Sequence, residues 1–189
     1  MPVTSLSRLA KTAHDPSRPV AEDDVLPAFY WQRLCVVRLA RGMPADTVSK
    51  TSRAIDGRMA LGIPVSYMGA HVYTAITRLP LGQAICSFAT FIARQPDSSV
   101  LMYNDTHNGN TDVGATSSLN TNQTLPPSWG PSLGPCRFFR RSIGAPIPGA
   151  FVVQPAEGLA IPVAVCLPQD DLEALKKDSL WRQYTRCIG

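Results

Sequence analysis

A stretch of about 30 residues without hydrophobic periodicity, 104–135, most constrains how this chain can fold. The stretch is rich in Asn, Gly, Thr and Ser, whose side chains satisfy nearby backbone groups and favour turns. Loops of this length are uncommon inside compact domains, and those that occur are functional, ordered by a partner, or disordered. The sequence therefore predicts a long polar loop at 104–135, which separates two regions with regular patterns and is the candidate functional segment.

Four segments before this loop have the apolar spacing of amphipathic helices. The acidic residues that open the first segment and the arginines that close it suit the two ends of a helix dipole. The last segment also fits a buried strand, because it is apolar, short and bounded by Gly82 and Pro96. The N-terminal half is therefore predicted to be mainly helical, with about four helices at 22–41, 44–61, 66–79 and 81–95.

The region after the loop favours β structure and ends in a helix. Apolar runs at 150–154 and 159–166 predict two strands, and Pro162 places the second run at a sheet edge or a bulge. The final segment, 168–184, begins with acidic residues and ends with arginines, as a helix does. The predicted fold class is therefore α+β, with a helical N-terminal half, a long loop, a small β-leaning segment and a C-terminal helix.

The length and composition favour one domain with an unstructured start. A chain of 189 residues can form a single core, and no second domain is required. Residues 1–21 contain three prolines and little apolar periodicity, so they are predicted to form a flexible basic arm on a globular domain at 22–189. Only 17% of the residues are charged, against about 25% in ordinary domains, which indicates a surface that contacts something else.

A short basic and aromatic run is the strongest local signal for binding. Single-stranded nucleic acid is bound by cationic grooves in which aromatic rings stack on the bases. An edge strand with buried phenylalanines and edge-protecting arginines would give the same pattern. The nucleic-acid interpretation assigns the run and the arm to RNA contact, through Arg137, Phe138, Phe139, Arg140 and Arg141 and through Arg8, Lys11 and Arg18.

The sequence carries no recognisable catalytic or metal motif. The five cysteines are dispersed without the close pairs that bind zinc. Asn108, Asn110 and Asp112 are spaced like the first half of a calcium loop, but the turn glycine and the closing glutamate are missing, which favours a simple turn cluster. No metal and no cofactor are therefore predicted. A thiol hydrolase remains open, with Cys136 as nucleophile and its partners drawn from His71, His107 and Asp105.

These features predict a structural protein and not an enzyme. The leading hypothesis is a self-assembling viral coat or nucleocapsid protein that forms a homo-oligomer and contacts single-stranded RNA, located in the cytoplasm or the virion. No apolar run reaches the roughly 18 residues that a membrane span needs. The Ser, Thr, Arg and Lys of the first 14 residues also fit an organellar import segment. Two alternatives stay open: a supernumerary subunit of an organellar or ribonucleoprotein complex, and a small Cys-dependent hydrolase.

Overall fold

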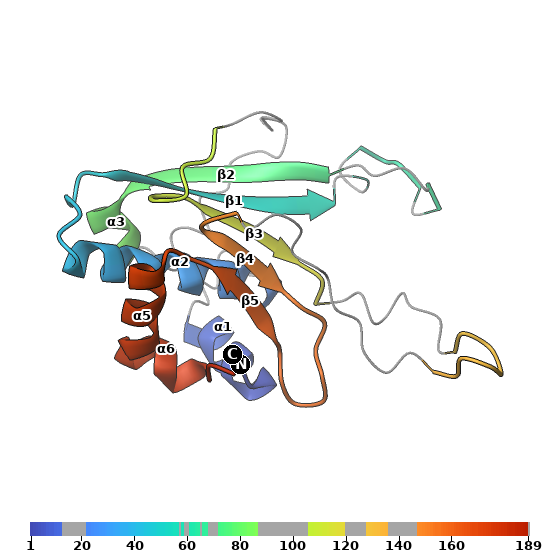
Figure 1. Cartoon of the computed structure of the whole chain (residues 1–189). Coiled ribbons are helices and arrows are strands. Elements are labelled where there is room, and N and C mark those ends of the chain that lie inside the picture. The colour runs from blue at the N-terminus through green and yellow to red at the C-terminus, as the bar shows by residue number, and fades with distance from the viewer. Residues whose placement is uncertain are drawn as a thin grey trace.

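The computed structural model describes most of the chain as one mixed sheet with helices beside it (Figure 1). The described residues are 1–12, 22–56, 58, 61–64, 66–67, 72–86, 106–119, 128–135 and 147–188. The helices are α1 (Val3–Thr12), α2 (Glu22–Ala40), α3 (Leu81–Cys86), α5 (Gln169–Lys177) and α6 (Ser179–Tyr184). The strands are β1 (Val48–Asp56), β2 (Val72–Pro80), β3 (Val113–Ser117), β4 (Ala150–Val153) and β5 (Val163–Cys166).

The five strands form a sheet with the order β2-β1-β3-β4-β5. The three central strands, β1, β3 and β4, run parallel to one another, and the two outer strands pair antiparallel to their neighbours. Because parallel neighbours begin at the same edge of a sheet, the starts of β1, β3 and β4 lie together, along with the ends of β2 and β5. Segments from all five strands therefore meet at that edge.

Helix α2 forms the centre of the core. Its aromatic residues Phe29, Tyr30 and Trp31 are buried. The ring of Tyr30 stacks on Phe151 of β4 with their centroids 4.4 Å apart, which joins α2 to the sheet. On its other side, α2 contacts α1, α5 and α6, which gather below the sheet in Figure 1. The inner face of the sheet and the C-terminal helices thus share one core, built around α2.

The prediction of a mainly helical N-terminal half is wrong. The segments expected as helices at 44–61 and 66–79 instead supply β1 and β2, which pair along nine residues from Val48↔Pro80 to Asp56↔Val72. The apolar spacing in these segments fits a helix, but their Val, Ile, Thr and Tyr content favours a strand, and pairing with a neighbour decides between the two. Of the helix expected at 81–95, the described part is α3.

The long polar loop contains a central strand of the sheet. Val113 and Ala115 of β3 are buried, while the residues between and after them are only partly covered. A five-residue strand with two small apolar side chains gives too short an alternation to stand out from a polar loop. The C-terminal region follows the prediction more closely. Strand β4 is confirmed, β5 begins after Pro162 at the sheet edge, and the expected final helix is divided into α5 and α6 at Asp178.

Part of the expected N-terminal arm forms helix α1. Its residues Leu6 and Leu9 are 1% and 4% exposed and belong to the main core, and Val3 donates a backbone hydrogen bond to Leu159 at 2.9 Å. Residues 13–21 lie outside the described residues, and the division into an arm and one domain stays a prediction.

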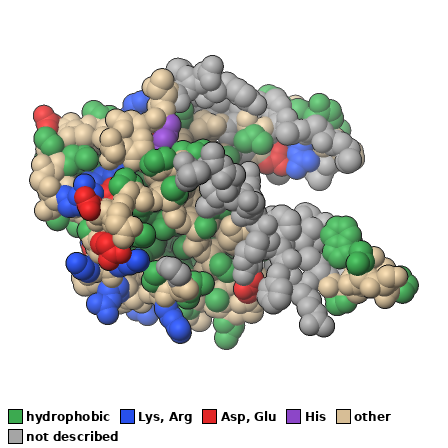
Figure 2. All heavy atoms as spheres, viewed as in Figure 1, with side chains coloured by type: hydrophobic (Ala, Val, Ile, Leu, Met, Phe, Trp, Pro, Cys, Tyr) green, Lys and Arg blue, Asp and Glu red, His purple; other side chains and the backbone are tan. Residues whose placement is uncertain are grey.

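The surface differs between the two ends of the molecule. In Figure 2, Lys and Arg side chains gather at the end where α5 and α6 lie, and hydrophobic side chains lie on the described turn at 128–135, at the opposite end. Trp129 and Leu133 of that turn are 54% and 78% exposed. Among the described helices, none has the length and apolar character that crossing a membrane requires.

Candidate functional site

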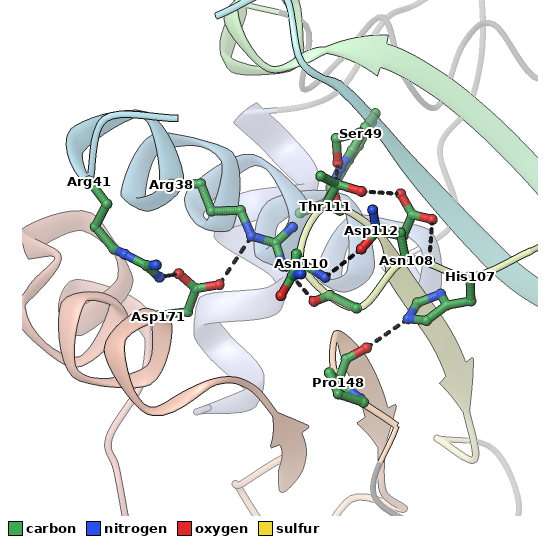
Figure 3. A network of polar contacts seen from close by, with 12 residues as sticks. Arg38, Arg41, Ser49, His107, Asn108, Asn110, Thr111, Asp112, Pro148 and Asp171 are labelled. Carbon is green, nitrogen blue, oxygen red and sulfur yellow. Dashed lines mark hydrogen bonds and ion pairs between the residues drawn. The ribbon is translucent and has the colours of Figure 1, made fainter. Parts of the chain in front are cut away.

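A network of buried and exposed polar groups lies at the sheet edge where the parallel strands begin (Figure 3). Its centre is the loop of residues 106–112, which leads into β3 and is called the 106–112 loop below. The network also includes the end of α2, the start of β1, the turn before β4 and the start of α5. Three of these segments contact the loop directly, and α5 is joined to it through Arg38. The side chains of His107, Asn108 and Asn110 are exposed on its outer surface.

Asp112 holds the 106–112 loop to β1. One carboxylate oxygen accepts hydrogen bonds from the Lys50 backbone N–H at 3.2 Å and from the Thr111 hydroxyl at 2.9 Å. The other accepts from the Asn108 backbone N–H at 2.8 Å and lies 3.5 Å from Lys50 Nζ. Burial alone would raise the pKa of Asp112, but these hydrogen bonds and the lysine charge outweigh it and lower the pKa below its ordinary value of 3.8. Asp112 therefore stays ionised as a structural anchor.

Because its pKa is lowered in the folded state, Asp112 should stabilise the protein above pH 4 and lose that effect as the pH falls through its folded pKa. We expect Asp112→Asn to cost about 2 kcal/mol at pH 7, since the amide turns an NH₂ group toward donors. The difference in unfolding free energy between the two proteins should shrink below pH 4 in denaturant titrations. Asp170→Asn, at an exposed position, is the control and should show a much smaller difference. A difference for Asp112→Asn that does not change with pH would contradict this role.

A buried ion-pair cluster joins α2 to α5. Asp171 is 2% exposed and accepts from Arg38 Nε at 3.1 Å and from Arg41. Arg38 is fully buried, and its Nη2 group also donates to the carbonyl of Gly109 at 3.3 Å. Burial lowers the pKa of Arg38, but an arginine retains its charge at any ordinary pH. The charge of Arg38 therefore connects α5, α2 and the 106–112 loop.

Two glycines let the 106–112 loop pack closely on the turn before β4. A Cβ atom on Gly149 would lie 2.2 Å from the Asp112 carbonyl oxygen, and one on Gly109 would lie 2.5 Å from Pro148 Cβ. Gly149 also has φ +84°, a conformation that favours glycine. Next to this contact, His107 Nε2 lies 2.7 Å from the Pro148 carbonyl oxygen. The contact with Pro148 orients the imidazole ring of His107. The position of this ring therefore depends on the close approach of the two segments, which Gly109 and Gly149 allow.

The contacts of this site explain how the fold is stabilised better than they explain a chemical reaction. In the described part of the chain, His107 is exposed and meets a carbonyl and not a carboxylate. Burial raises the pKa of the Cys35 thiol to about 11, which keeps it an unreactive thiol. Cys136, His71 and Asp105 of the hydrolase alternative lie outside the described residues. Cys35 therefore does not supply a reactive nucleophile.

The calcium-like spacing forms a turn cluster, as the sequence predicts. The Asn108 side-chain oxygen accepts from the Asn110 backbone N–H at 3.1 Å, and the Asn108 carbonyl accepts from Thr111 and Asp112. The oxygens of Asn108 and Asp112 are thus occupied by the loop itself and, for Asp112, by Lys50 of β1. Within the described ranges, no group of three or more His, Cys, Asp or Glu side chains could hold a metal ion.

The structure brings together few of the residues assigned to nucleic acid. Arg8 and Lys11 lie on α1, and the Arg8 guanidinium carbon lies 5.7 Å from the centroid of the Tyr184 ring, so it packs on the same chain. Arg18 and the run of residues 137–141 lie outside the described residues. Arg38, Asp112 and Asp171 were missed as site residues because charges at helix ends and in turns look solvated in a sequence. No local signal identifies them as partners.

The sequence of this chain is similar to proteins named as acyltransferases. No family model matches the sequence. The chain is 38% identical over 201 residues to O-acyltransferase pigD of Monascus ruber, covering 93% of this chain and 44% of that protein. It is 34% identical over 200 residues to O-acetyltransferase SAT5 of Stachybotrys chartarum, covering 92% of this chain and 43% of that protein. The chain thus spans less than half the length of these relatives.

The fold matches a solved acetyltransferase structure. The crystal structure of F. sporotrichioides TRI101 complexed with Coenzyme A and T-2 has a TM-score of 0.80 to this chain at 24% identity, covering 98% of this chain and 50% of the other. This likeness overturns the helical fold prediction. The named relatives overturn the prediction of a non-enzymatic capsid, virion or RNA-binding protein, because they are O-acyltransferases. The chain therefore has the fold of about half of a TRI101 structure and is similar in sequence to O-acyltransferases.

Proposed function

We propose that this chain works in an O-acyltransferase, which moves an acyl group from coenzyme A to a hydroxyl group of a small molecule. One observation carries the proposal: more than nine-tenths of the chain aligns with proteins named as O-acyltransferases, at 34% and 38% identity. The TRI101 structure, which contains Coenzyme A and T-2, supports it through the shared fold. Acetyl is the proposed acyl group, because most of the named relatives are O-acetyltransferases.

The proposed reaction is the transfer of an acyl group from a thioester to an alcohol. The acceptor hydroxyl oxygen attacks the thioester carbonyl carbon, so a C–O bond forms and the C–S bond breaks. A base takes the hydroxyl proton and returns a proton to the coenzyme A sulfur, which leaves as a thiol. A general base for this step has to reach the acceptor hydroxyl within hydrogen-bond distance. The described residues place His107 on the surface against a carbonyl, so we assign it no catalytic role.

The proposed contribution of this chain is a rigid scaffold for the substrates. The buried Arg38 and Asp171 pair and the Asp112 anchor fix the sheet edge and its loop, and catalysis needs reacting groups held in place. Rigid sheets that carry polar loops are the usual supports of small-molecule sites. In this proposal the chain binds coenzyme A and the acceptor through the surfaces of the sheet and its loops.

Acetyl transfer by the full chain tests the proposal. We expect acetyl-CoA and an alcohol from a panel that includes trichothecenes to give an acetyl ester, detected by mass spectrometry, with one free coenzyme A thiol released per ester. The alcohol with its hydroxyl blocked is the control and should give neither product. Thiol release at the same rate without an acceptor would indicate hydrolysis and contradict the proposal. Absence of both the ester and acceptor-dependent thiol release would also contradict it.

A further inference from the structure

A basic surface lies where α1, α5 and α6 come together, at the end where Figure 2 shows Lys and Arg side chains gathered. Four exposed cations on these helices and on the tail after α6 have no ion pair within the described part of the chain: Lys11, Lys177, Arg182 and Arg186. A further cation, Lys176, is paired with Glu173 at 3.0 Å. The basic surface therefore has an excess of positive charge, and its field attracts negatively charged partners.

The outer face of α1 belongs to the basic surface. Thr4, Arg8 and Lys11 are exposed and lie four and three residues apart, so they share one face of the helix. The Arg8 guanidinium carbon lies 5.7 Å from the centroid of the Tyr184 ring, which places this face beside α6. A cation over an aromatic ring keeps its charge, because the ring has none to neutralise it. The cations of α1 and α6 therefore act on the same partner.

The loop of residues 154–162, between β4 and β5, adds an exposed apolar side chain next to this face. The Val3 backbone N–H donates to the Leu159 carbonyl at 2.9 Å, and Pro2 pairs with Ala160 in a β-bridge. Leu159 is 82% exposed. Because a helix rises about 1.5 Å per residue, Val3 and Arg8 lie only about 8 Å apart along the axis of α1. Leu159 thus stands at the margin of the basic surface.

We propose that the basic surface and Leu159 together bind an anionic phospholipid membrane. The cations meet the negatively charged lipid headgroups, which attract each nearby Lys or Arg. Leu159 enters the boundary between the headgroups and the acyl chains, where its side chain leaves water. This interaction is independent of the proposed acyl transfer, because it needs neither coenzyme A nor the acceptor alcohol.

A membrane fits this surface better than an acidic protein does. Among residues 154–162, Leu159 is the only large apolar side chain that is exposed. A protein partner would need a shaped pocket for this one side chain, and the centres of protein interfaces are depleted of Lys. A fluid bilayer accepts a single apolar side chain wherever it stands, and the long cationic side chains adapt to the headgroups. One apolar tip beside dispersed cations therefore favours lipid.

Cosedimentation of the full chain with lipid vesicles tests the proposal. We expect binding to vesicles of equimolar phosphatidylserine and phosphatidylcholine, weakened by salt, and no binding to phosphatidylcholine alone. Arg182→Gln should lower the partition coefficient about fivefold, the effect of one cation at an anionic surface. Leu159→Ser should lower it about tenfold, because the apolar contact with the bilayer is lost. Both positions are exposed, and circular dichroism checks that the variants fold.

Two matched controls lie away from the basic surface. Arg58→Gln removes the same charge from the segment after β1, and Leu133→Ser removes an equally large apolar side chain, 78% exposed, from the turn at the opposite end. Both should leave binding unchanged. Equal losses for Arg182→Gln and Arg58→Gln would show that only net charge matters, and unchanged binding of Leu159→Ser would show adsorption by charge alone. Either result would overturn the proposal, as would retention on immobilised polyglutamate without vesicle binding, which indicates an acidic protein partner.

Discussion

Replacing Gly149 by alanine should destabilise the protein by about 3 kcal/mol or more, enough to prevent folding if the native protein is marginally stable. Two effects add at this position. The backbone has φ +84°, which costs a residue with a side chain about 1–2 kcal/mol. The new Cβ would also lie 2.2 Å from the Asp112 carbonyl oxygen, a backbone atom of a loop that other contacts hold in place. Urea titration followed by circular dichroism measures the loss.

Gly130→Ala separates the steric effect from the conformational one. Gly130 has a similar φ of +95°, but no atom of the described residues lies within 4 Å of the position its Cβ would take. This variant should therefore lose only the backbone contribution, about 1–2 kcal/mol. Equal losses at the two glycines would show that the close approach of the 106–112 loop to the turn before β4 is not important for stability, which would contradict our description of the site.

Replacing Asp171 by asparagine should have the other large effect, a loss of about 3–5 kcal/mol in the free energy of unfolding. The carboxylate lies 2% exposed between Arg38 and Arg41, and Arg38 is fully buried. Asparagine keeps the size of the side chain but removes the only charge that directly accepts from Arg38 in the described residues. A buried guanidinium without an opposite charge is costly, because water cannot solvate it. Chemical denaturation measures the loss.

The control for Asp171→Asn is Glu173→Gln, two residues further along α5. Glu173 pairs with Lys176 at 3.0 Å on the surface, where ion pairs contribute little to stability. We expect the unfolding midpoint of Glu173→Gln to stay close to that of the unaltered protein. If Asp171→Asn behaves in the same way, the ion-pair cluster does not hold α5 on α2.

The sequence predicts those elements of this fold whose local pattern agrees with their packing. Helix α2 has capping charges and a cluster of aromatic residues, and both fit its central place in the core. Pro162 correctly indicates that the following strand lies at a sheet edge. Strands β1 and β2 were missed because their apolar residues fit helical spacing, and only their pairing with each other selects the strand.

The candidate site could not be predicted, because its partners are far apart in the sequence. Arg38 and Asp171 are 133 residues apart, and Ser49 meets the carbonyl of Thr111 across 62 residues. In the sequence, Arg38 looks like a charge that suits a helix C-terminus, and Asp171 like one that suits a helix start. The fold gives both a second role, since they become the buried link between α2 and α5.

The function was misjudged because the features used for it are not specific. A basic N-terminus, a low fraction of charged residues and a long polar loop occur in coat proteins, but they also occur in enzymes. The structure gives Arg8 a partner in the Tyr184 ring, and the polar loop contributes a central strand. The similarity to O-acyltransferases over more than nine-tenths of the chain has no counterpart in a short motif that sequence reading could recognise.

Titration of the full chain with coenzyme A by isothermal calorimetry tests the proposed acyltransferase role most directly. The proposal predicts saturable heat with one coenzyme A bound per chain, retained when acetyl-CoA replaces it and not reproduced by adenosine monophosphate at the same concentration. An absence of saturable heat at coenzyme A concentrations up to the millimolar range, from protein shown to be folded by circular dichroism, would contradict the role of this chain in binding the acyl donor.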